Sequence, residues 1–172
     1  MTNRGVLLRL LMERLGIDPQ LGTFADRLRL QKDVYLLQEL GLQTGFSYNW
    51  YIRGPYSPGL TAAAFEEVAK PDAQGNTTHE GFRLSDGAIG KLNALAKLTG
   101  ARESTGLAEE RWLELLASMH FYRHRMYFPP NEKRRRDNPA WLYRQLPPAK
   151  RTLFPESAAL EAAGALKAGN LW

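Results

Sequence analysis

Two consecutive stretches decide the fold of this chain: RLRLQKDVYLLQ at residues 27–38 and FSYNWYIRGPYSPGL at residues 46–60. The first has helical spacing, because its apolar residues fill one broad arc when each residue advances by about 100°. The second is aromatic and partly alternating, which is typical of a short strand or extended segment. We expect Gly54-Pro55 to end that segment and Ser57-Pro58 to cap and begin the next helix. The apolar arc of the first stretch, with the residues before it, consists of Phe24, Leu28, Leu30, Val34, Tyr35 and Leu37.

Two glutamines, Gln31 and Gln38, fall near the middle of this apolar arc. An amide buried without hydrogen-bond partners costs roughly 1–3 kcal/mol per unsatisfied group. We therefore expect both amides to bond the spare backbone groups of the loop around Gly54. A direct contact with a ligand or partner is the alternative.

Helical spacing recurs through most of the remaining chain. The longest run, residues 107–127, carries large apolar side chains three and four positions apart and is expected to be the central core helix. Residues 81–86 predict a short strand that leads into a capped helix, after a polar loop at residues 71–80, in the manner of the wing of winged-helix proteins. The other expected helices are residues 3–15, a helix from Pro58 through Val68, a helix from Asp86 through Ala96, a short helix with Trp141 and Leu142, and residues 156–168.

The expected fold is therefore mainly α: a compact helical domain of six or seven helices with a small wing-like two-stranded element. Residues 1–130 are expected to form this helical domain. Residues 131–172 are expected to form a basic extension with two short helices that pack on the same domain.

Length and composition exclude several classes of protein. At 172 residues the chain is long enough to bury a core as one domain. The absence of cysteine excludes disulfides, thiolate metal sites and cysteine nucleophiles. No stretch approaches the roughly 18 uninterrupted apolar residues of a membrane span, and Val6 to Leu15 is amphipathic, unlike a leader sequence. We expect a cytoplasmic protein without membrane contact.

The positive charge is concentrated in the C-terminal third. Between His120 and Arg151 nine lysines and arginines stand against two carboxylates, Glu132 and Asp137. Aromatic residues are interleaved with these cations, a combination compatible with binding of nucleic acid. A solvated basic face is the alternative. The candidate nucleic-acid contacts are Arg123, Arg125, Lys133, Arg134, Arg135, Arg136 and Arg144.

The sequence carries little that points to catalysis. His120 and His124 have the i, i+4 spacing of metal ligands, but no third ligand is evident. Phosphate-binding glycine loops, nucleophile elbows and paired-carboxylate signatures are absent. We expect two partly exposed histidines, no cofactor, no metal, no catalytic residue and no enzyme; a metal-dependent hydrolase or nuclease at these histidines is a weaker alternative.

One combined motif resembles a known family. Leu30-Gln31-Lys32, then Tyr35-Leu36-Leu37, then an aromatic segment that ends in Gly54-Pro55-Tyr56-Ser57 look like the SocA-like or Panacea antitoxin domain, and more closely its YwgA-like relatives. The resemblance covers residues 24–68 and extends weakly to residues 112–122. Where the Panacea group commonly has Gly-Pro-Val, this chain has Gly-Pro-Tyr-Ser.

The resemblance implies a non-enzymatic, mainly helical domain that binds a partner protein, a toxin or phage-defence effector encoded nearby. With the loop residue Arg53 added, the candidate partner-binding residues are Gln31, Lys32, Tyr35, Arg53, Gly54, Pro55, Tyr56 and Ser57. The alternative function is a winged-helix-like regulator that binds nucleic acid through the basic C-terminal third.

Overall fold

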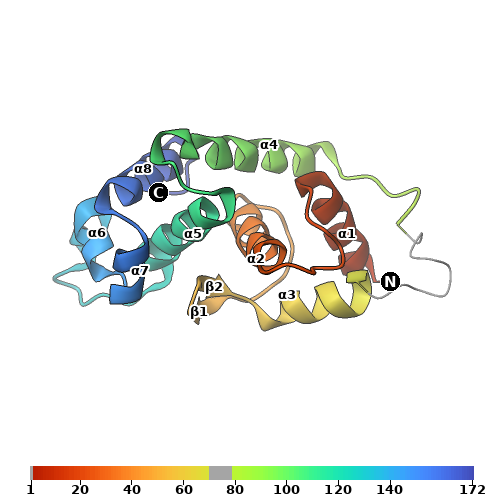
Figure 1. The fold of residues 1–172 in the computed structure, drawn as a ribbon, viewed down its shortest axis with the longest axis horizontal. Helices are drawn as coiled ribbons and strands as arrows, with labels where there is room; N and C mark the ends of the chain where they lie inside the picture. The colour runs from red at the N-terminus through yellow and green to blue at the C-terminus, as the bar shows by residue number, and fades with distance from the viewer. Residues whose placement is uncertain (1, 70–78) are drawn as a thin grey trace.

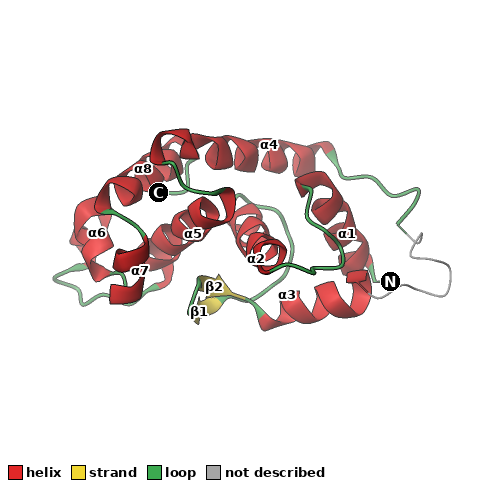
Figure 2. Cartoon of the chain, in the orientation of Figure 1, coloured by secondary structure: helices red, strands yellow, loops and turns green. Residues whose placement is uncertain are grey.

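The computed structural model describes residues 2–69 and 79–172 and is mainly helical, with one small antiparallel hairpin in this part of the chain (Figures 1 and 2). The α-helices are α1 (Asn3–Leu15), α2 (Phe24–Glu39), α3 (Pro58–Ala63), α4 (Asp86–Gly100), α5 (Glu109–Arg125), α6 (Pro139–Gln145), α7 (Pro148–Leu153) and α8 (Glu156–Ala168). The strands are β1 (Asn49–Tyr51) and β2 (Gly54–Tyr56). A π-helical turn, η1 (Ala64–Ala69), and two 3₁₀-helices, η2 (Ala101–Thr105) and η3 (Lys133–Asp137), complete the elements. Nearly all of the polar loop expected at residues 71–80 lies outside the described residues.

Helices α2 and α5 contact each other in the middle of the molecule (Figure 1). Figure 1 shows α4 along the top, α1 and α3 to the right, and α6, α7 and α8 to the left. The hairpin lies below α5 and leads directly into α3. None of the described helices has the length and apolar character needed to cross a membrane.

Helix α2 forms where the sequence predicts it, and its environment explains its composition. Thr23 caps the helix, since its hydroxyl accepts a hydrogen bond from the Asp26 amide. Residues 30–37 are all buried, which includes positions on every side of the helix. Phe24 departs from the predicted apolar arc, because its side chain is 52% exposed. The helix is therefore a central one rather than an amphipathic surface helix.

The hairpin corrects the prediction that Gly54-Pro55 ends the extended segment. These two residues instead begin β2, in which Pro55 pairs with Trp50 and Gly54 pairs with Tyr51. A proline is tolerated here because the sheet has two strands only, so that its missing N–H does not interrupt a ladder. Gly54 has φ +87°, a left-handed conformation that favours glycine.

The prediction of a wing-like strand at residues 81–86 is wrong. Residues 82–85 form no strand, and α4 begins directly afterwards at Asp86 with Ser85 as its cap. Phe82 is 55% exposed, so this segment lacks the buried face that would hold a strand against the domain. Within residues 2–69 and 79–172 the two-stranded element is the hairpin at residues 49–56.

Helix α5 is the central core helix, as predicted. Trp112, Leu115, Leu116 and Met119 are fully buried along it. The indole N–H of Trp112 donates a hydrogen bond of 2.8 Å to the Leu98 carbonyl at the end of α4. This bond ties two long helices together inside the main hydrophobic cluster.

The C-terminal helices share this core. Leu142 of α6, Phe154 after α7 and Leu166 of α8 are buried in the same hydrophobic cluster as α5. The described part of the chain has eight α-helices where six or seven were expected, because the predicted break at Pro147-Pro148 is the start of α7. Proline is favourable at a first helical position, where its N–H has no intrahelical partner. The basic run 133–136 lies in η3 rather than in a loop.

Candidate functional site

A cavity of about 360 Å³ lies between α2, the hairpin and the α3–η1 segment. Four large apolar side chains line it and remain exposed: Phe24 at 52%, Tyr51 at 58%, Ile52 at 75% and Phe65 at 37%. The sequence predicted Phe24 and Phe65 as apolar positions of helices, but the structure places both at this opening. We call this feature the hairpin pocket.

Gln31 fixes one wall of the hairpin pocket to α2. Its side-chain oxygen accepts from the Ser57 amide at 2.9 Å, and its nitrogen donates to the Ser57 carbonyl at 3.1 Å and to the Thr61 hydroxyl at 2.9 Å. The Gln31 amide is thus satisfied by backbone groups near Gly54, as expected from the sequence. Gln38 behaves differently from that expectation, because it bonds the backbone of Phe46 and the hydroxyl of Thr44 rather than the loop around Gly54.

Lys32 of α2 fixes β2 to the helix through a hydrogen bond. Its side chain is almost completely buried, and its amine donates a hydrogen bond of 2.6 Å to the Pro55 carbonyl. Burial and the nearby Lys150 cation lower the pKa of Lys32 to about 7. At neutral pH this amine is therefore protonated only part of the time. No pattern in the sequence signalled a buried amine at this position.

A buried carboxylate, Glu114 of α5, organises the cations around Lys32. Glu114 is fully buried and pairs with Lys150, with Arg111 at 3.1 Å and with Arg53 at 3.8 Å. Three cations thus share one carboxylate next to the partly protonated amine. This cluster links the hairpin, α5 and α7, and sequence reasoning missed it because its members are far apart in the chain.

Arg53 connects the buried cluster to the hairpin pocket. Its guanidinium lies 5.6 Å from the centre of the Phe24 ring, and its Nη1 atom has no hydrogen-bond partner among the described residues. On the neighbouring strand, the Tyr56 hydroxyl accepts a hydrogen bond of 2.9 Å from Thr61. Its ring lies 5.5 Å from that of Tyr51. This side of the rim is therefore aromatic, with the partly exposed Arg53 guanidinium beside the rings.

The structure divides the eight predicted partner-binding residues into two groups. Those that line the hairpin pocket are Gln31, Lys32, Arg53, Gly54 and Tyr56. The other three are buried: Tyr35, whose hydroxyl lies 2.7 Å from His120 Nδ1, Pro55, and Ser57, whose hydroxyl caps α3. None of these three lines the pocket.

The ionisable side chains that line the hairpin pocket are all basic. Its lining includes Arg27, Lys32 and Arg53 and no aspartate or glutamate. Arg27 donates to the backbone carbonyls of Leu21 and Gly22, which leaves its positive charge without a carboxylate partner among the described residues. The pocket is therefore an apolar hollow with a positive rim.

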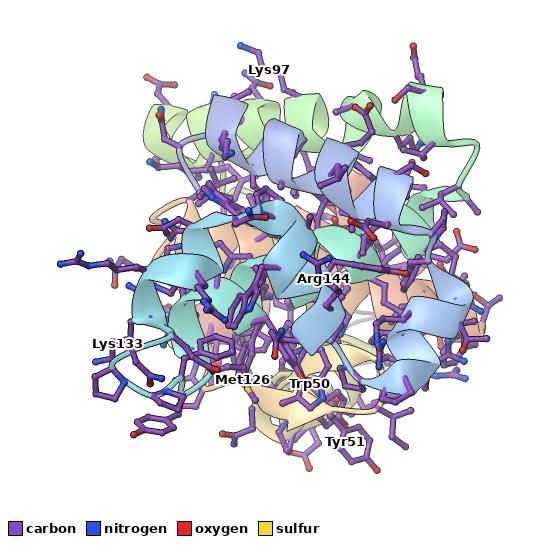
Figure 3. The ribbon with its side chains drawn as sticks, turned by 90° about the vertical axis from the view of Figure 1, so that its left-hand side faces the viewer. Trp50, Tyr51, Lys97, Met126, Lys133 and Arg144 are labelled. Carbon is purple, nitrogen blue, oxygen red and sulfur yellow. The ribbon has the colours of Figure 1, made fainter. Side chains whose placement is uncertain are left out.

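The predicted nucleic-acid contacts are spread over a second face, formed by the end of α5, η3 and α6. Arg123 pairs with Asp137 at 2.6 Å and Arg125 pairs with Glu39 at 2.8 Å, so both charges are neutralised. The remaining five form no ion pair within residues 2–69 and 79–172, and of these only Arg136 is partly buried. Figure 3 shows two of them, Lys133 and Arg144, on the side that carries α6. We call Lys133, Arg134, Arg135, Arg136 and Arg144 the basic face.

The two histidines differ from their expected exposure. His120 is 3% exposed, and burial together with the neighbouring cationic side chains lowers its pKa to about 3. His124 is exposed, and its ring is stacked on that of His120 at 4.4 Å between centroids. Within the described residues no group of three or more His, Cys, Asp or Glu side chains is arranged to hold a metal ion.

Comparison with known proteins gives no match for this chain among family models, curated proteins or solved structures.

Proposed function

We propose that this chain is a non-enzymatic protein-interaction domain that binds a segment of a partner protein in the hairpin pocket. The segment carries an apolar side chain that enters the pocket and a carboxylate that pairs with Arg53. The observation that carries this proposal is the ring of exposed apolar side chains around a concave opening.

The distribution of apolar surface supports a docking role. Eight large apolar side chains are exposed in the described part of the chain, and four of them line the hairpin pocket. Scattered exposed apolar residues are ordinary, but a cluster around a cavity is typical of interaction sites. Burying one leucine or phenylalanine side chain of a partner contributes about 1.5–3 kcal/mol.

The charge of the pocket selects the partner segment. With Arg27 and Arg53 at the rim and no carboxylate in the lining, an acidic residue of the partner is attracted and a basic one is repelled. The Arg53 side chain is 36% exposed, so its guanidinium is accessible for a charge-assisted bond with that carboxylate. The resemblance to antitoxin domains adds the expectation that this partner is a toxin or defence effector encoded nearby.

Tyr51→Ala tests this function. The chain is co-expressed with the product of the adjacent reading frame, and the affinity of the purified pair is measured by calorimetry. Because Tyr51 lies at the pocket rim with its ring exposed, its loss removes an aromatic anchor and weakens binding by at least about tenfold. The double variant Arg53→Ala/Tyr56→Ala removes the Arg53 cation and the Tyr56 ring from the rim. It also weakens binding of the partner.

Tyr127→Ala is the matched control, since Tyr127 is also an exposed tyrosine, at 80%, but does not line the pocket. It leaves the affinity unchanged. Equal affinities for wild type, Tyr51→Ala and the Arg53/Tyr56 double variant contradict the proposed surface. Failure of the pair to associate at all contradicts the neighbouring product as partner.

A second candidate function is direct binding of nucleic acid by the basic face. It is favoured by five cations without ion pairs among the described residues and by the exposed ring of Tyr127 beside them in the sequence. Cations of this kind contact phosphates, and a free ring can stack on a base. Titration with duplex DNA and single-stranded RNA at several salt concentrations tests this candidate.

A further inference from the structure

A second cavity, of about 410 Å³, lies among α1, α2, α4, η2 and the start of α5. Figure 1 shows α4 running across the top of α2 in this region. The lining is rich in charged side chains, in contrast to the hairpin pocket. The polar residues that matter here are Arg14, Arg29, Asp33, Arg102 and Glu109. We call this feature the arginine cavity.

The carboxylate of Asp33 is the unusual group of the arginine cavity. Its side chain is 2% exposed, yet its Oδ2 atom has no hydrogen-bond partner within the described residues. A buried carboxylate oxygen without a hydrogen bond is costly, because it has lost water and the Arg29 cation, 3.9 Å away, offsets only part of that loss. Burial raises the pKa of Asp33 to about 7, against the opposing effect of the Arg29 cation.

The Nε–H group of Arg29, a donor without a hydrogen-bond partner among the described residues, lies next to this acceptor. The Nε atom of Arg29 lies 3.9 Å from Asp33 Oδ2, too far for a hydrogen bond, and it too lacks a partner among the described residues. Arg29 does not close the gap because its Nη2 is bonded to Glu109 at 2.8 Å and to the Leu15 carbonyl at 2.8 Å. These bonds hold the guanidinium in a position where its Nε–H lies beside the Asp33 oxygen. Both groups lack a hydrogen-bond partner among the described residues.

The rim of the arginine cavity adds positive charge. Arg14 is exposed at the end of α1 and has no ion pair in the described part of the chain. Arg102 lies 3.9 Å from Glu109, whose other oxygen is bonded to Arg29. Three arginines therefore stand against two carboxylates, one of which is Asp33 itself.

We propose that the arginine cavity binds a small anion that presents a hydrogen-bond acceptor next to a donor, as a primary amide or the edge of a pyrimidine base does. The acceptor of the ligand bonds Arg29 Nε–H and its donor bonds Asp33 Oδ2. The anionic group of the ligand pairs with Arg14 at the rim. This site is separate from the hairpin pocket and does not depend on the proposed partner protein.

Calorimetric titration of the full chain with four probes tests the site. Uridine 5′-monophosphate and N-acetylglutamine each combine a negative charge with the required edge, on a base and on an amide respectively. N-Acetylmethionine has the charge and a similar length without the amide, and inorganic phosphate has charge only. We expect saturable binding of at least one of the first two at millimolar or lower concentration, with the last two at least about tenfold weaker. The stronger of the first two identifies the source of the edge.

Two variants locate the binding. Asp33→Asn keeps the size of the side chain and removes its charge, so we expect at least about tenfold weaker binding, the usual scale for a hydrogen bond to a charged group. Arg14→Gln changes an exposed residue and leaves the fold intact; it weakens both anionic probes. Glu161→Gln, on the exposed side of α8, is the matched control and changes nothing.

Three results overturn the proposal. The first is no binding of either edge-bearing probe, which means that the two bare atoms bond water only. The second is equal binding of N-acetylmethionine, and the third is unchanged affinity in folded Asp33→Asn. If Asp33→Asn does not fold, unchanged affinity in Arg14→Gln decides against the site.

Discussion

Lys32 shows how one buried amine connects the hairpin to the charge balance of the core. Its one hydrogen-bond acceptor within the described residues is the Pro55 carbonyl, while the carboxylate of Glu114 is occupied by Lys150 and Arg111. The amine is therefore desolvated without a counter-ion of its own, which is why its pKa falls to about 7.

This pKa predicts that Lys32 makes the fold more stable as the pH rises from 7 to 10. In that range the unfolded chain holds a proton on Lys32 up to its ordinary pKa near 10.5, while the folded chain has released it. The unfolded state thus binds more protons, and the free energy of unfolding increases with pH, by up to about 4 kcal/mol. Urea unfolding at pH 7, 8, 9 and 10 measures this increase.

Lys32→Met is the comparison for this measurement, because it fills similar space without a titrating group. Its unfolding free energy rises less over the same range; a smaller rise remains because burial also lowers the pKa of Lys150. Parallel curves for wild type and Lys32→Met contradict the assigned role.

At this scale the sequence was informative only where a residue type is costly to bury. Gln31 lies in an apolar arc, so its need for partners was predictable, and its bonds to Ser57 confirm it. The burial of Lys32 and Asp33 was not predicted, because a periodic pattern assigns polar residues to a solvent-facing side that a central helix does not have. The burial of α2 on every side depends on elements far away in the chain.

Among the elements, the hairpin depends on the close approach of Gly54 to α5. A Cβ atom at Gly54 would lie 2.7 Å from the Ser118 hydroxyl, and the backbone there has φ +87°. Gly54→Ala therefore destabilises the chain by about 1–3 kcal/mol, through both the clash and the left-handed backbone. Thermal and urea unfolding followed by circular dichroism measure the loss.

Gly59→Ala is the control, since Gly59 in α3 has ordinary helical backbone and no neighbour closer than 3.8 Å to an added Cβ. Its stability stays equal or rises by up to about 1 kcal/mol, because alanine favours a helix. Combining Gly54→Ala with Ser118→Ala removes the clash and recovers part of the loss. Equal effects of the two glycine variants rule out a special role for Gly54.

The elements themselves were largely predictable, and the exceptions have physical causes. Helices α2 and α5 follow the apolar period of their sequences. Residues 54–56 form a strand against local preference because Lys32 and Gln31 hold this segment in place. The strand predicted at residues 81–86 does not form, because this turn-rich segment is largely exposed and Leu84 is no more than half-buried against the core.

In the molecule as a whole, the basic face lies on η3 and α6, while the hairpin pocket lies beside α2. Binding of nucleic acid by the basic face predicts a salt dependence that follows individual cations. Lys133→Ala reduces the slope of log affinity against log salt by about 0.9, if Lys133 neutralises one phosphate. Fluorescence anisotropy with duplex DNA at salt concentrations from about 50 to about 300 mM measures this slope.

Lys97→Ala is the control for this slope, because Lys97 is an exposed lysine on α4 that Figure 3 shows at the opposite end from Tyr51. It leaves both affinity and slope unchanged. No binding of DNA or RNA at low salt removes this candidate function, whereas equal slopes for all three proteins mean that the basic face is not the contact.

At the molecular scale the sequence anticipated a helical protein with a basic C-terminal part. It did not indicate that Lys150 of this part reaches the buried Glu114 or that Leu166 completes the core around α5. Composition changes at residue 130, but apolar burial continues across that position. That residues 131–172 pack on the same domain was expected from the sequence, but the residues through which they do so are visible only in three dimensions.

The polar side chains buried along α2 also constrain how the chain is made. Gln31 bonds Thr61, 30 positions later, and Tyr35 bonds His120, 85 positions later. Until those partners arrive, these groups keep their water, so that early collapse of α2 onto apolar neighbours is unfavourable. During synthesis the ribosome has to pass His120, and α5 has to leave the exit tunnel, before α2 reaches its final surroundings. The buried hydrogen bonds of α2 are therefore completed only after α5 has been synthesised.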